Sequence, residues 1–527
     1  MTTSSISRRT VPGAVRPAPA PGHRPRSQRE TPLLTGVREA AHLPARLHTP
    51  GHEGGAWSAP DVENVVGRAF LEHDIWIPTG ELSRALTAAE DLAAEAWGAK
   101  RAWLIGNGST AGTLAWLLAT SSEGQEVVVG RDAHTSVMAG LILSGARPVW
   151  VPPRICPDHE ISLGVEVSDV DRVLARTPSA CQVVATSPGY ASICVETDLV
   201  CEVARRSGVL AYVDQAWGPH LAFHPDLPTD ALAAGADGAV VSLHKTGTAL
   251  SSGALLLAGN GLSRERIARL DTAVRMTQTT SPLLPLLASV DAARRDLVVR
   301  GKESLEVAVR EADALAGRLR RIGGLRVLEA EDVGLPFHRK DPLKIVVDVS
   351  GLGLTGWQVG EELRHLGVAV EGADDRRIYL VRGACVDGTG GAARLRHSED
   401  DAVRAFSALA ARLRPVTGSF PVSVPGDARQ TLRTPGAWQV LAECPDQVLT
   451  PRQAFQAQTV AVPLAQAIGR VVAEPVVPYP PGVPVLLPGE VVGGVQAEFL
   501  REVLAGGGHL HGCADPGLTT LRVVAGV

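Results

Sequence analysis

The chain has 527 residues, of which 45% are hydrophobic and 20% are charged. This length predicts several domains, and the balance of apolar and charged residues allows a large core, which excludes wholesale disorder. The formal net charge of −5 argues against a general nucleic-acid or membrane-surface binder, because no excess positive charge is present to hold phosphates. Seven cysteines without a C-x-x-C pair favour free thiols in a reducing compartment, so we expect a cytoplasmic protein.

The amino-terminal segment differs in composition from the rest of the chain. It is rich in arginine and proline and has no acidic residue before Glu30, which predicts a disordered tail over residues 1–30. Farther along, the uncharged run from Ala102 to Ser122 is long enough to span a membrane. Gly-Asn-Gly-Ser-Thr interrupts this run, so we interpret it as a buried strand, a loop and a helix.

Between residues 70 and 300, apolar β-branched runs alternate with helical periodicity. The alternation predicts an α/β fold with a mainly parallel seven-stranded sheet and helical crossovers, in which ligands bind where strands end. A helix is expected over Thr87–Gly98, opened by the capping box Thr87-x-x-Glu90. The expected strands are Ala102–Ile105, Glu126–Val129, Pro148–Val151, Gln182–Ala185, Val209–Val213, Gly238–Val241 and Ala254–Leu257.

A smaller α+β domain is expected after this region. It begins with an amphipathic helix over Ser304–Ile322, which Gly323 and Gly324 end. The elements that follow are a strand at Lys344–Val349, a helix at Gly356–Leu366, and strands near Val368–Glu371 and Ile378–Val381.

Two further features divide the chain into domains. Pro415–Pro425 marks a boundary, and Pro478-Tyr-Pro-Pro-Gly-Val-Pro beyond it is a stiff extended or turn segment. We therefore expect a tail over residues 1–30, an amino-terminal arm with a large domain over 31–300, a small domain over 301–415, and an α+β carboxyl-terminal domain over 416–527.

The chain has only five lysines, and one of them carries the strongest chemical signal. Lys245 follows an apolar strand in Val-Val-Ser-Leu-His-Lys-Thr-Gly-Thr, where Ser242 and His244 stand beside it. Such a lysine suits a desolvated amine that carries an aldehyde cofactor, although most lysines at strand ends simply lie on the surface.

Two companion motifs favour the cofactor interpretation. Asp214 ends another apolar strand, and a carboxylate there can keep a pyridine nitrogen protonated. Gly106-Asn-Gly-Ser-Thr-Ala-Gly joins a strand to a helix and brings Ser109, Thr110 and backbone N–H groups to a helix start, which suits a phosphate. Phosphate cradle, ring carboxylate and lysine together predict pyridoxal phosphate. No metal site is expected.

With these motifs the sequence resembles the fold-type-I pyridoxal-phosphate enzymes, and specifically the bacterial ornithine/lysine/arginine decarboxylases. The resemblance covers about residues 46 to 525. The matching segments are Leu47-His-Thr-Pro-Gly-His, Asn107-Gly-Ser-Thr-Ala-Gly, Asp132-Ala-His-Thr-Ser-Val, Val213-Asp-Gln-Ala-Trp, Phe223-His-Pro-Asp-Leu-Pro, Ser242-Leu-His-Lys-Thr, Thr280-Ser-Pro, Pro478-Tyr-Pro-Pro-Gly-Val-Pro and Pro488-Gly-Glu.

The resemblance implies a role for each matching residue. Lys245 would form the Schiff base with the cofactor, Asp214 would pair with the pyridine nitrogen, and His134 would stack on the ring. Trp217 would border the ring, and Thr280 would reach the phosphate of a neighbouring subunit, which implies a homodimer or a higher even oligomer. The residues implied in phosphate binding are Ser109, Thr110, Ser242 and His244.

The function expected from this resemblance is decarboxylation of ornithine, lysine or arginine, a carbon–carbon lyase reaction of polyamine metabolism. Transamination or elimination by the same cofactor, and a non-catalytic regulatory paralogue, remain alternatives; a nucleic-acid binder acting through the arginine-rich tail is the weakest of them. Glu53 stands where many relatives have lysine, and Ser281-Pro-Leu-Leu stands where they have Ser-Pro-Ser-Tyr. A dibasic substrate needs an acceptor for its distal cation, for which Glu53, Glu81 and Glu490 are the acidic candidates.

Overall fold

The computed structural model describes residues 26–42, 48–56, 58–384, 391–413, 437–479 and 482–526. Most of the predicted tail and the predicted boundary at Pro415–Pro425 lie outside the described residues, as do Pro480 and Pro481. No helix in the described part of the chain is long and apolar enough to cross a membrane. The run from Ala102 to Ser122 instead forms a strand, a turn and a helix, as predicted.

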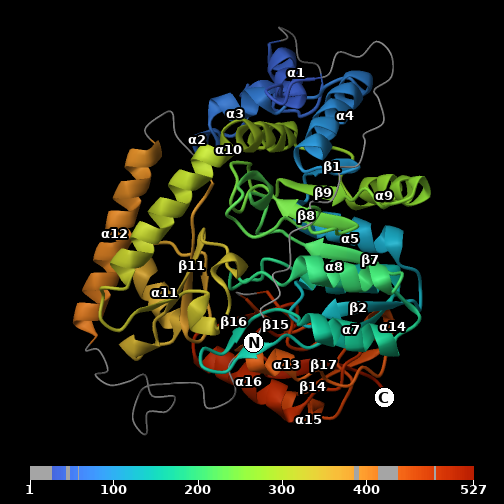
Figure 1. Cartoon of the computed structure of the whole chain (residues 1–527), viewed down its shortest axis with the longest axis vertical. Helices are drawn as coiled ribbons and strands as arrows, with labels where there is room; N and C mark the ends of the chain where they lie inside the picture. Colours follow the sequence, from blue (N-terminus) through green and yellow to red (C-terminus); the bar gives the residue numbers. More distant parts are fainter. Residues whose placement is uncertain are drawn as a thin grey trace, which may run out of the picture.

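A seven-stranded sheet forms the centre of the molecule, in the order β1-β9-β8-β7-β6-β2-β3 (Figure 1). Only β9 runs antiparallel to its neighbours, so the other six strands end at the same edge. The seven predicted strands are confirmed. Their bounds are β1 Arg101–Ile105, β2 Glu126–Gly130, β3 Arg147–Val151, β6 Ala180–Thr186, β7 Leu210–Asp214, β8 Gly238–Ser242 and β9 Ala254–Ala258.

Helices cover both faces of this sheet, which explains why its strands are apolar throughout. On β7, Tyr212 packs with one group of helices, whereas Ala211 and Val213 pack with the other. The first group is α5 (Gly108–Thr120), α6 (Thr135–Ser144) and α9 (Arg264–Thr277), and the second is α7 (Val167–Arg176) and α8 (Thr197–Arg206).

Two helices extend beyond their predicted starts. Helix α4 spans Thr79–Ala96, so the predicted capping box at Thr87 is wrong. Glu90 instead turns toward β1, where it accepts hydrogen bonds from Arg101 (2.7 Å) and from the Leu104 backbone N–H (3.3 Å). Helix α10 spans Leu284–Leu319 rather than beginning at Ser304, because its amino-terminal half packs on α1 (Pro32–Ala41) and α4.

A smaller antiparallel sheet lies beside the carboxyl-terminal half of α10, in the order β10-β11-β13-β12. The predicted strand at Val368–Glu371 is displaced, because Gly367 and Val368 still complete the end of α11 and only Glu371 begins to pair with Tyr379. The bounds are β10 Arg326–Leu328, β11 Lys344–Asp348, β12 Gly372–Ala373, β13 Arg377–Val381, α11 Gly356–His365 and α12 Gly391–Arg412.

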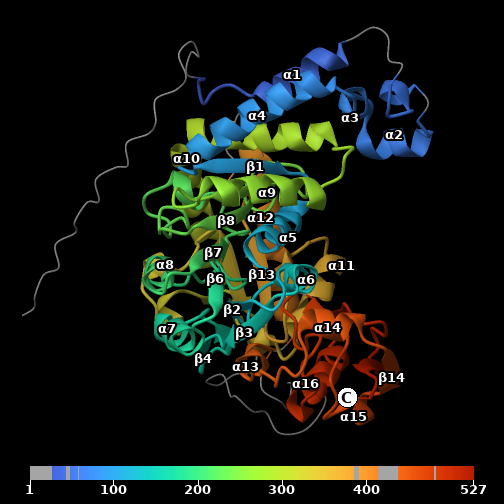
Figure 2. The same ribbon diagram turned by 90° about the vertical axis from the view of Figure 1, so that its right-hand side faces the viewer.

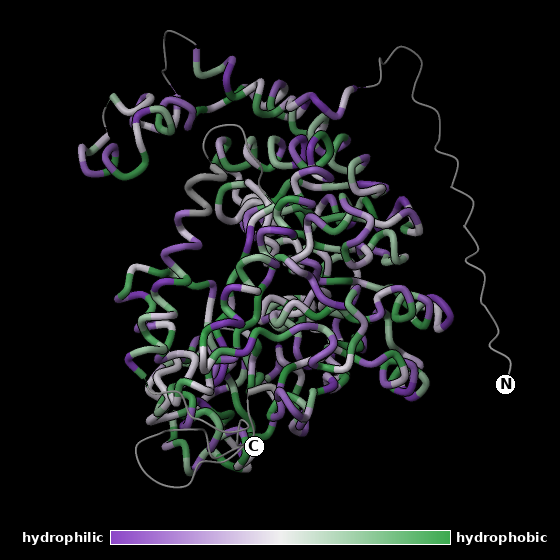
Figure 3. Tube along the Cα trace, turned by 60° about the vertical axis from the view of Figure 1, so that its left-hand side comes forward, coloured by the Kyte–Doolittle hydropathy of each residue, from purple (hydrophilic) through white to green (hydrophobic). Residues whose placement is uncertain are grey.

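The carboxyl-terminal region forms the end of the molecule away from α1 and α4 and has a separate apolar core (Figure 2). It contains β14 (Thr459–Pro463), β15 (Val477–Tyr479), β16 (His509–His511), β17 (Thr520–Val524), α13 (Ala437–Ala442), α14 (Pro451–Gln456), α15 (Leu464–Ala467) and α16 (Gly494–Ala505). At the opposite end, α2 (Pro60–Val66) and α3 (Arg68–His73) form an arm that projects from the body and mixes hydrophilic with hydrophobic segments (Figure 3). The hairpin β4 (Ile155–Cys156) and β5 (Ile161–Ser162) completes the described strands.

Candidate active site

The predicted catalytic residues meet in one cavity at the edge where the parallel strands end. The space between its lining side chains amounts to about 440 Å³, which includes the solvent at its open mouth. Lys245, Asp214 and His134 all line it, although more than a hundred residues separate His134 from Lys245. The complete lining is Ser109, Asp132, His134, Thr186, Tyr190, Asp214, Ala216, Trp217, Lys245 and Val483.

Lys245 reaches the cavity from a tight turn after β8. Its backbone N–H donates to the Ser242 carbonyl (3.3 Å), and its side-chain nitrogen lies 4.2 Å from the ring centroid of Trp217. Burial lowers the pKa of Lys245, and the nearby carboxylates of Asp214 and Glu371 only partly oppose that effect. The amine therefore gives up its proton more readily than an ordinary lysine, as a nucleophile must.

Asp214 and His134 enter from two other strand ends. Asp214 ends β7 and is only 5% exposed, and its Oδ1 accepts the Ala216 backbone N–H (3.1 Å). His134 caps α6, and its Nδ1 accepts the Ser136 backbone N–H (3.2 Å), which places the ring proton on Nε2. Burial lowers the pKa of His134, so its ring is neutral and can stack on a flat aromatic ligand.

The predicted phosphate-binding residues are only partly in the cavity. Ser109 lines it at the start of α5, where Gly108 has φ +77°, a conformation that favours glycine. Thr110 is exposed and does not line the cavity, and His244 Nδ1 lies 3.1 Å from the Gly253 carbonyl. Ser242 is fully buried, yet its hydroxyl has no hydrogen-bond partner among the described residues.

These observations test whether pyridoxal phosphate fits the residues that are present. Two buried hydroxyls near the strand ends, those of Ser242 and Thr186, lack partners in the described part of the chain. A buried polar group without a partner is costly, and a bound anion at these strand ends would supply the missing bonds. An amine, a carboxylate, a neutral imidazole and a helix start complete the set that an anionic pyridine aldehyde requires, and the residues therefore fit the cofactor.

The other residues that the sequence singled out lie elsewhere. Thr280 is exposed between α9 and α10 and does not line the cavity. Glu490 is fully buried and pairs with Arg131 (3.1 Å), and Glu81 lines a groove between α1 and α4. Glu53 lies in a short turn with φ +48° and is also outside the cavity. None of the three acidic candidates therefore lines the site.

A segment of the carboxyl-terminal region closes the cavity beside His134. Val483 lines the cavity, and the Thr135 backbone N–H donates to the Gly482 carbonyl (3.3 Å). Arg131 holds this segment in place by donating hydrogen bonds to the carbonyl oxygens of Pro484 (2.6 Å) and Val485 (2.9 Å). The carboxyl-terminal region thus forms part of the site.

Sequence reasoning missed several residues of the cavity. Thr186 is the register partner of Asp214 on β6, and its place at a strand end is the signal that could have found it. Asp132 lay within a motif already recognised, next to His134. Val483 lay within the recognised segment Pro478-Tyr-Pro-Pro-Gly-Val-Pro. Tyr190 had no local signal, because it comes from a loop whose position depends on the folded chain.

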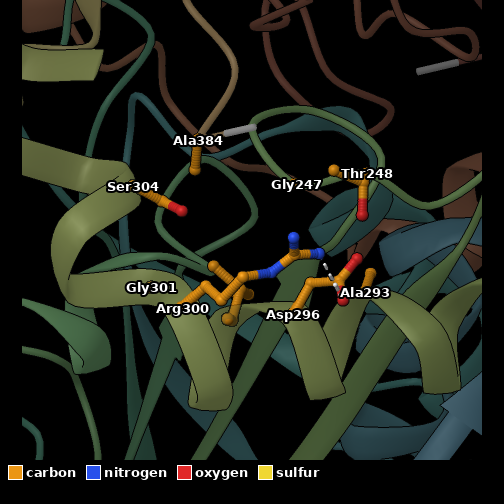
Figure 4. A pocket seen from close by; sticks show the side chains of 9 residues that line it. Gly247, Thr248, Ala293, Asp296, Arg300, Gly301, Ser304 and Ala384 are labelled. Atoms are coloured by element: carbon orange, nitrogen blue, oxygen red, sulfur yellow. Dashed lines mark hydrogen bonds and ion pairs between the residues drawn. The ribbon is translucent and has the colours of Figure 1, made fainter. Parts of the chain in front are cut away.

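A second hollow lies beside the segment that follows Lys245. Gly247, Thr248 and Ala384 face α10 across it, and the Arg300 guanidinium pairs with Asp296 (3.3 Å) (Figure 4). None of its lining side chains is a buried polar group that lacks a partner. This hollow therefore shows no sign of an absent ligand, in contrast to the cavity at the strand ends.

A mainly parallel sheet whose strand ends present this lysine, aspartate and histidine defines the fold-type-I class of pyridoxal-phosphate enzymes. Residues 31–384 match the model of the Orn/Lys/Arg decarboxylase major domain, and residues 437–515 match that of the Orn/Lys/Arg decarboxylase C-terminal domain. The chain belongs to the Orn/Lys/Arg decarboxylase family, and it is a pyridoxal-phosphate-dependent decarboxylase of basic amino acids.

Named relatives share this organisation over most of the chain. An arginine decarboxylase of Halalkalibacterium halodurans is 32% identical and is matched over 94% of this chain and 98% of its own length. An arginine decarboxylase of Bacillus subtilis is 31% identical with the same coverage. The solved structure of the Escherichia coli constitutive lysine decarboxylase superposes with a TM-score of 0.75 at 21% identity, covering 94% of this chain and 82% of that one, and shows the same fold.

Proposed function

We propose that the chain decarboxylates arginine to agmatine. The gathering of Lys245, Asp214 and His134 in one cavity is the observation that carries the cofactor chemistry. The match to the decarboxylase family supports the reaction type. The choice of arginine is supported by two relatives named arginine decarboxylase, which are 31–32% identical along 98% of their length. A relative named constitutive lysine decarboxylase is 25% identical over 74% of its length.

Each residue of the cavity would have its own role in the reaction. Pyridoxal phosphate, when bound, supplies an aldehyde for the substrate amine and a ring that accepts the electrons released as carbon dioxide leaves. Asp214 would hold a proton on the ring nitrogen, and the neutral ring of His134 would hold the cofactor flat. Lys245 would yield its place on the aldehyde carbon to the substrate amine, and it would later take that place again to release the amine product. Val483 would help to exclude water.

Ser109, Ser242 and the start of α5 would hold the phosphate. Ser109 contributes a hydroxyl at the helix start, where backbone N–H groups are free to bind an anion. The hydroxyl of Ser242, which lacks a partner in the described part of the chain, and the imidazole of His244 lie in the segment that leads to Lys245. Thr110 would bind the phosphate only if the exposed start of α5 moved toward the cavity. Trp217 would border the ring.

The reaction is tested by giving the purified holoenzyme arginine, lysine and ornithine separately, without any keto acid. Arginine is expected to give agmatine and carbon dioxide with a kcat/KM at least ten times that for the other two. A higher kcat/KM for lysine or ornithine would overturn the choice of arginine. Turnover that requires a keto acid would indicate a transaminase, and no turnover with intact cofactor would favour the regulatory paralogue.

The attachment point of the cofactor gives a further prediction. Borohydride reduction of the holoenzyme, followed by peptide mass spectrometry, is expected to find the cofactor on Lys245, because its amine alone lies among the predicted partners in the cavity. Lys302, which is exposed on α10, serves as the internal control and should stay unmodified. An adduct on any of the other four lysines would contradict the assignment.

We also propose a homodimer, or a higher even oligomer, in which Thr280 reaches the phosphate of the neighbouring subunit. Its exposure outside its own cavity supports this role. Sedimentation of the holoenzyme at nanomolar concentration should show a dimer or larger species, and an active monomer would refute the proposal.

We also propose domain boundaries and a cellular location for this chain. We propose an amino-terminal tail (1–30), an arm with the cofactor-binding domain (31–300), a small domain (301–415) and a carboxyl-terminal domain (416–527). The 300/301 boundary falls within α10, so one continuous helix would connect the second and third parts. A cytoplasmic location is supported by the six described cysteines, none of which forms a disulfide.

A further inference from the structure

A buried histidine connects the turn that carries Lys245 to the smaller sheet. His220 follows the end of β7 and is fully buried. Its two ring nitrogens contact residues from distant segments: Nδ1 lies 3.0 Å from the Thr246 hydroxyl oxygen, and Nε2 lies 3.2 Å from Asp341 Oδ1. Thr246 directly follows Lys245, and Asp341 lies shortly before β11. None of the roles expected for the cavity uses these contacts.

The direction of the two hydrogen bonds follows from the charge of Asp341. Burial alone would raise the pKa of Asp341, but the contact with His220 and the bond from the Leu343 backbone N–H (3.0 Å) hold it below its ordinary value. The carboxylate is therefore ionised at neutral pH and can only accept. Nε2 of His220 donates to it, which leaves Nδ1 for the hydroxyl of Thr246. Asp341 is held in turn by its own backbone N–H, which donates to the Ser192 carbonyl (2.9 Å).

Thr246 anchors the turn in which Lys245 lies. Of residues 244–250, all of which the structure describes, Thr246 alone is buried. The turn is tight, since a Cβ atom at Gly247 would lie 2.5 Å from the Leu243 carbonyl oxygen. A shift of Thr246 would therefore move Lys245 as well.

The smaller sheet reaches Thr246 by two routes. One is the contact between Asp341 and His220, and the other is the Ala384 backbone N–H, which donates to the Thr246 carbonyl (2.5 Å). Asp341 precedes β11 and Ala384 follows β13, and these two strands pair directly with each other. Ala384 lies across from the residues that follow Thr246 (Figure 4). The hydroxyl and the carbonyl of Thr246 are therefore both held from the smaller sheet.

We propose that His220 is a positioning residue that, held by Asp341, fixes Thr246 and thereby places the side-chain nitrogen of Lys245 for attack on the aldehyde of the cofactor. The proposal rests on the role proposed for Lys245. In that step the nitrogen forms a double bond to the aldehyde carbon, and its two protons leave with the aldehyde oxygen as water. A misplacement of about 1 Å can slow such a step about a hundredfold. His220 does not line the cavity, so it acts through Thr246.

The rate at which the full chain, freed of cofactor, bonds to added pyridoxal phosphate measures the placement of Lys245. Thr246→Val keeps the shape of the side chain and removes the hydroxyl, so this rate is expected to fall about tenfold. Thr246→Ser keeps the hydroxyl and should restore most of the rate. Pyridoxamine phosphate has the same ring and phosphate but no aldehyde, so it should bind to both variants as tightly as to the wild type.

Thr113→Val is the matched control. Thr113 is also fully buried, and its hydroxyl bonds to one buried side chain, that of Tyr212 (2.9 Å). This variant should leave the rate of bonding relative to the pyridoxamine phosphate affinity unchanged. A wild-type rate in Thr246→Val would overturn the proposal, and so would a rate in Thr246→Ser as low as that in Thr246→Val. A loss of pyridoxamine phosphate affinity as large as the loss of rate would also overturn it, because the hydroxyl would then serve general structure.

If Thr246→Val fails to fold, His220→Gln decides the question. Glutamine can still donate to Asp341 from a nitrogen at the position of Nε2, but it has no group in place of Nδ1. The rate of bonding should fall about tenfold here too, and an unchanged rate would overturn the proposal. An adduct on a lysine other than Lys245 would instead overturn the proposed function.

Discussion

Asp214→Asn is expected to lower kcat by about a hundred- to a thousand-fold while the cofactor stays bound. Asparagine cannot hold a proton on the ring nitrogen, and a neutral pyridine is a poor acceptor of the electrons released at Cα. Removing one charge-stabilising partner in a dry site commonly costs about 3 kcal/mol of transition-state stabilisation. The cofactor should remain, because Ser109, Ser242 and Lys245 are unchanged. Carbon dioxide release, normalised to bound cofactor, is the measurement.

Asp237→Asn provides the matched control for this variant. Asp237 is also a partly buried carboxylate, directly before β8, and it accepts the Ala211 backbone N–H (2.9 Å) near the start of β7. Its replacement should lower stability slightly and leave kcat within a few-fold of the wild type. Equal losses of kcat in both variants would show that Asp214 acts through general stability.

Arg131→Met is expected to destabilise the folded chain by about 3–5 kcal/mol, because it leaves Glu490 buried without its partner. Both side chains of this pair are at most 1% exposed. The loss also frees the Pro484 and Val485 carbonyls, so the segment that closes the site should loosen and the affinity for the cofactor should fall. Guanidinium chloride unfolding followed by tryptophan fluorescence, at pH 8, is the measurement.

The destabilisation should depend on pH in a defined direction. Burial raises the pKa of Glu490 to about 7, above its ordinary value, so this group favours folding at acidic pH and loses that contribution as pH rises through 7. Arg131 lowers this pKa, and its removal raises it further. The defect of Arg131→Met should therefore be larger at pH 8 than at pH 6.

A double variant separates the pair from its surroundings. Arg131→Met with Glu490→Leu removes both charges, and replacing a buried ion pair with apolar residues is often nearly neutral. The double variant should recover most of the lost stability at pH 8. A double variant as unstable as Arg131→Met would show that the bonds to Pro484 and Val485 matter more than the charge of Glu490.

The sequence predicted the strands of the large sheet well, because their physics is local. A strand buried on both faces must be apolar along its whole length, and β7 and β8 show this without any knowledge of their neighbours. Helix starts were predicted less well. Thr87 and Glu90 have the spacing of a capping box, but Glu90 bonds to Arg101 on β1, a partner that only the tertiary structure supplies.

The candidate site shows the same difference between residues with a local sequence signal and residues whose role depends on the tertiary structure. Lys245, Asp214 and Ser109 stand at strand ends or helix starts, so local pattern sufficed to find them. Glu490 carried an acidic side chain near a recognised motif, but its buried pairing with Arg131 across 359 residues could not be read from that motif.

The closure of the cavity by Val483 has a consequence for how the enzyme is made. Lys245 emerges from the ribosome about 240 residues before Val483, an interval of about 10 to 50 s at ordinary rates of synthesis. During that time the large sheet can form, but the wall beside His134 is missing and water has access to the amine. We therefore expect the cofactor to be held stably only after the segment that contains Val483 has been made and has packed beside His134.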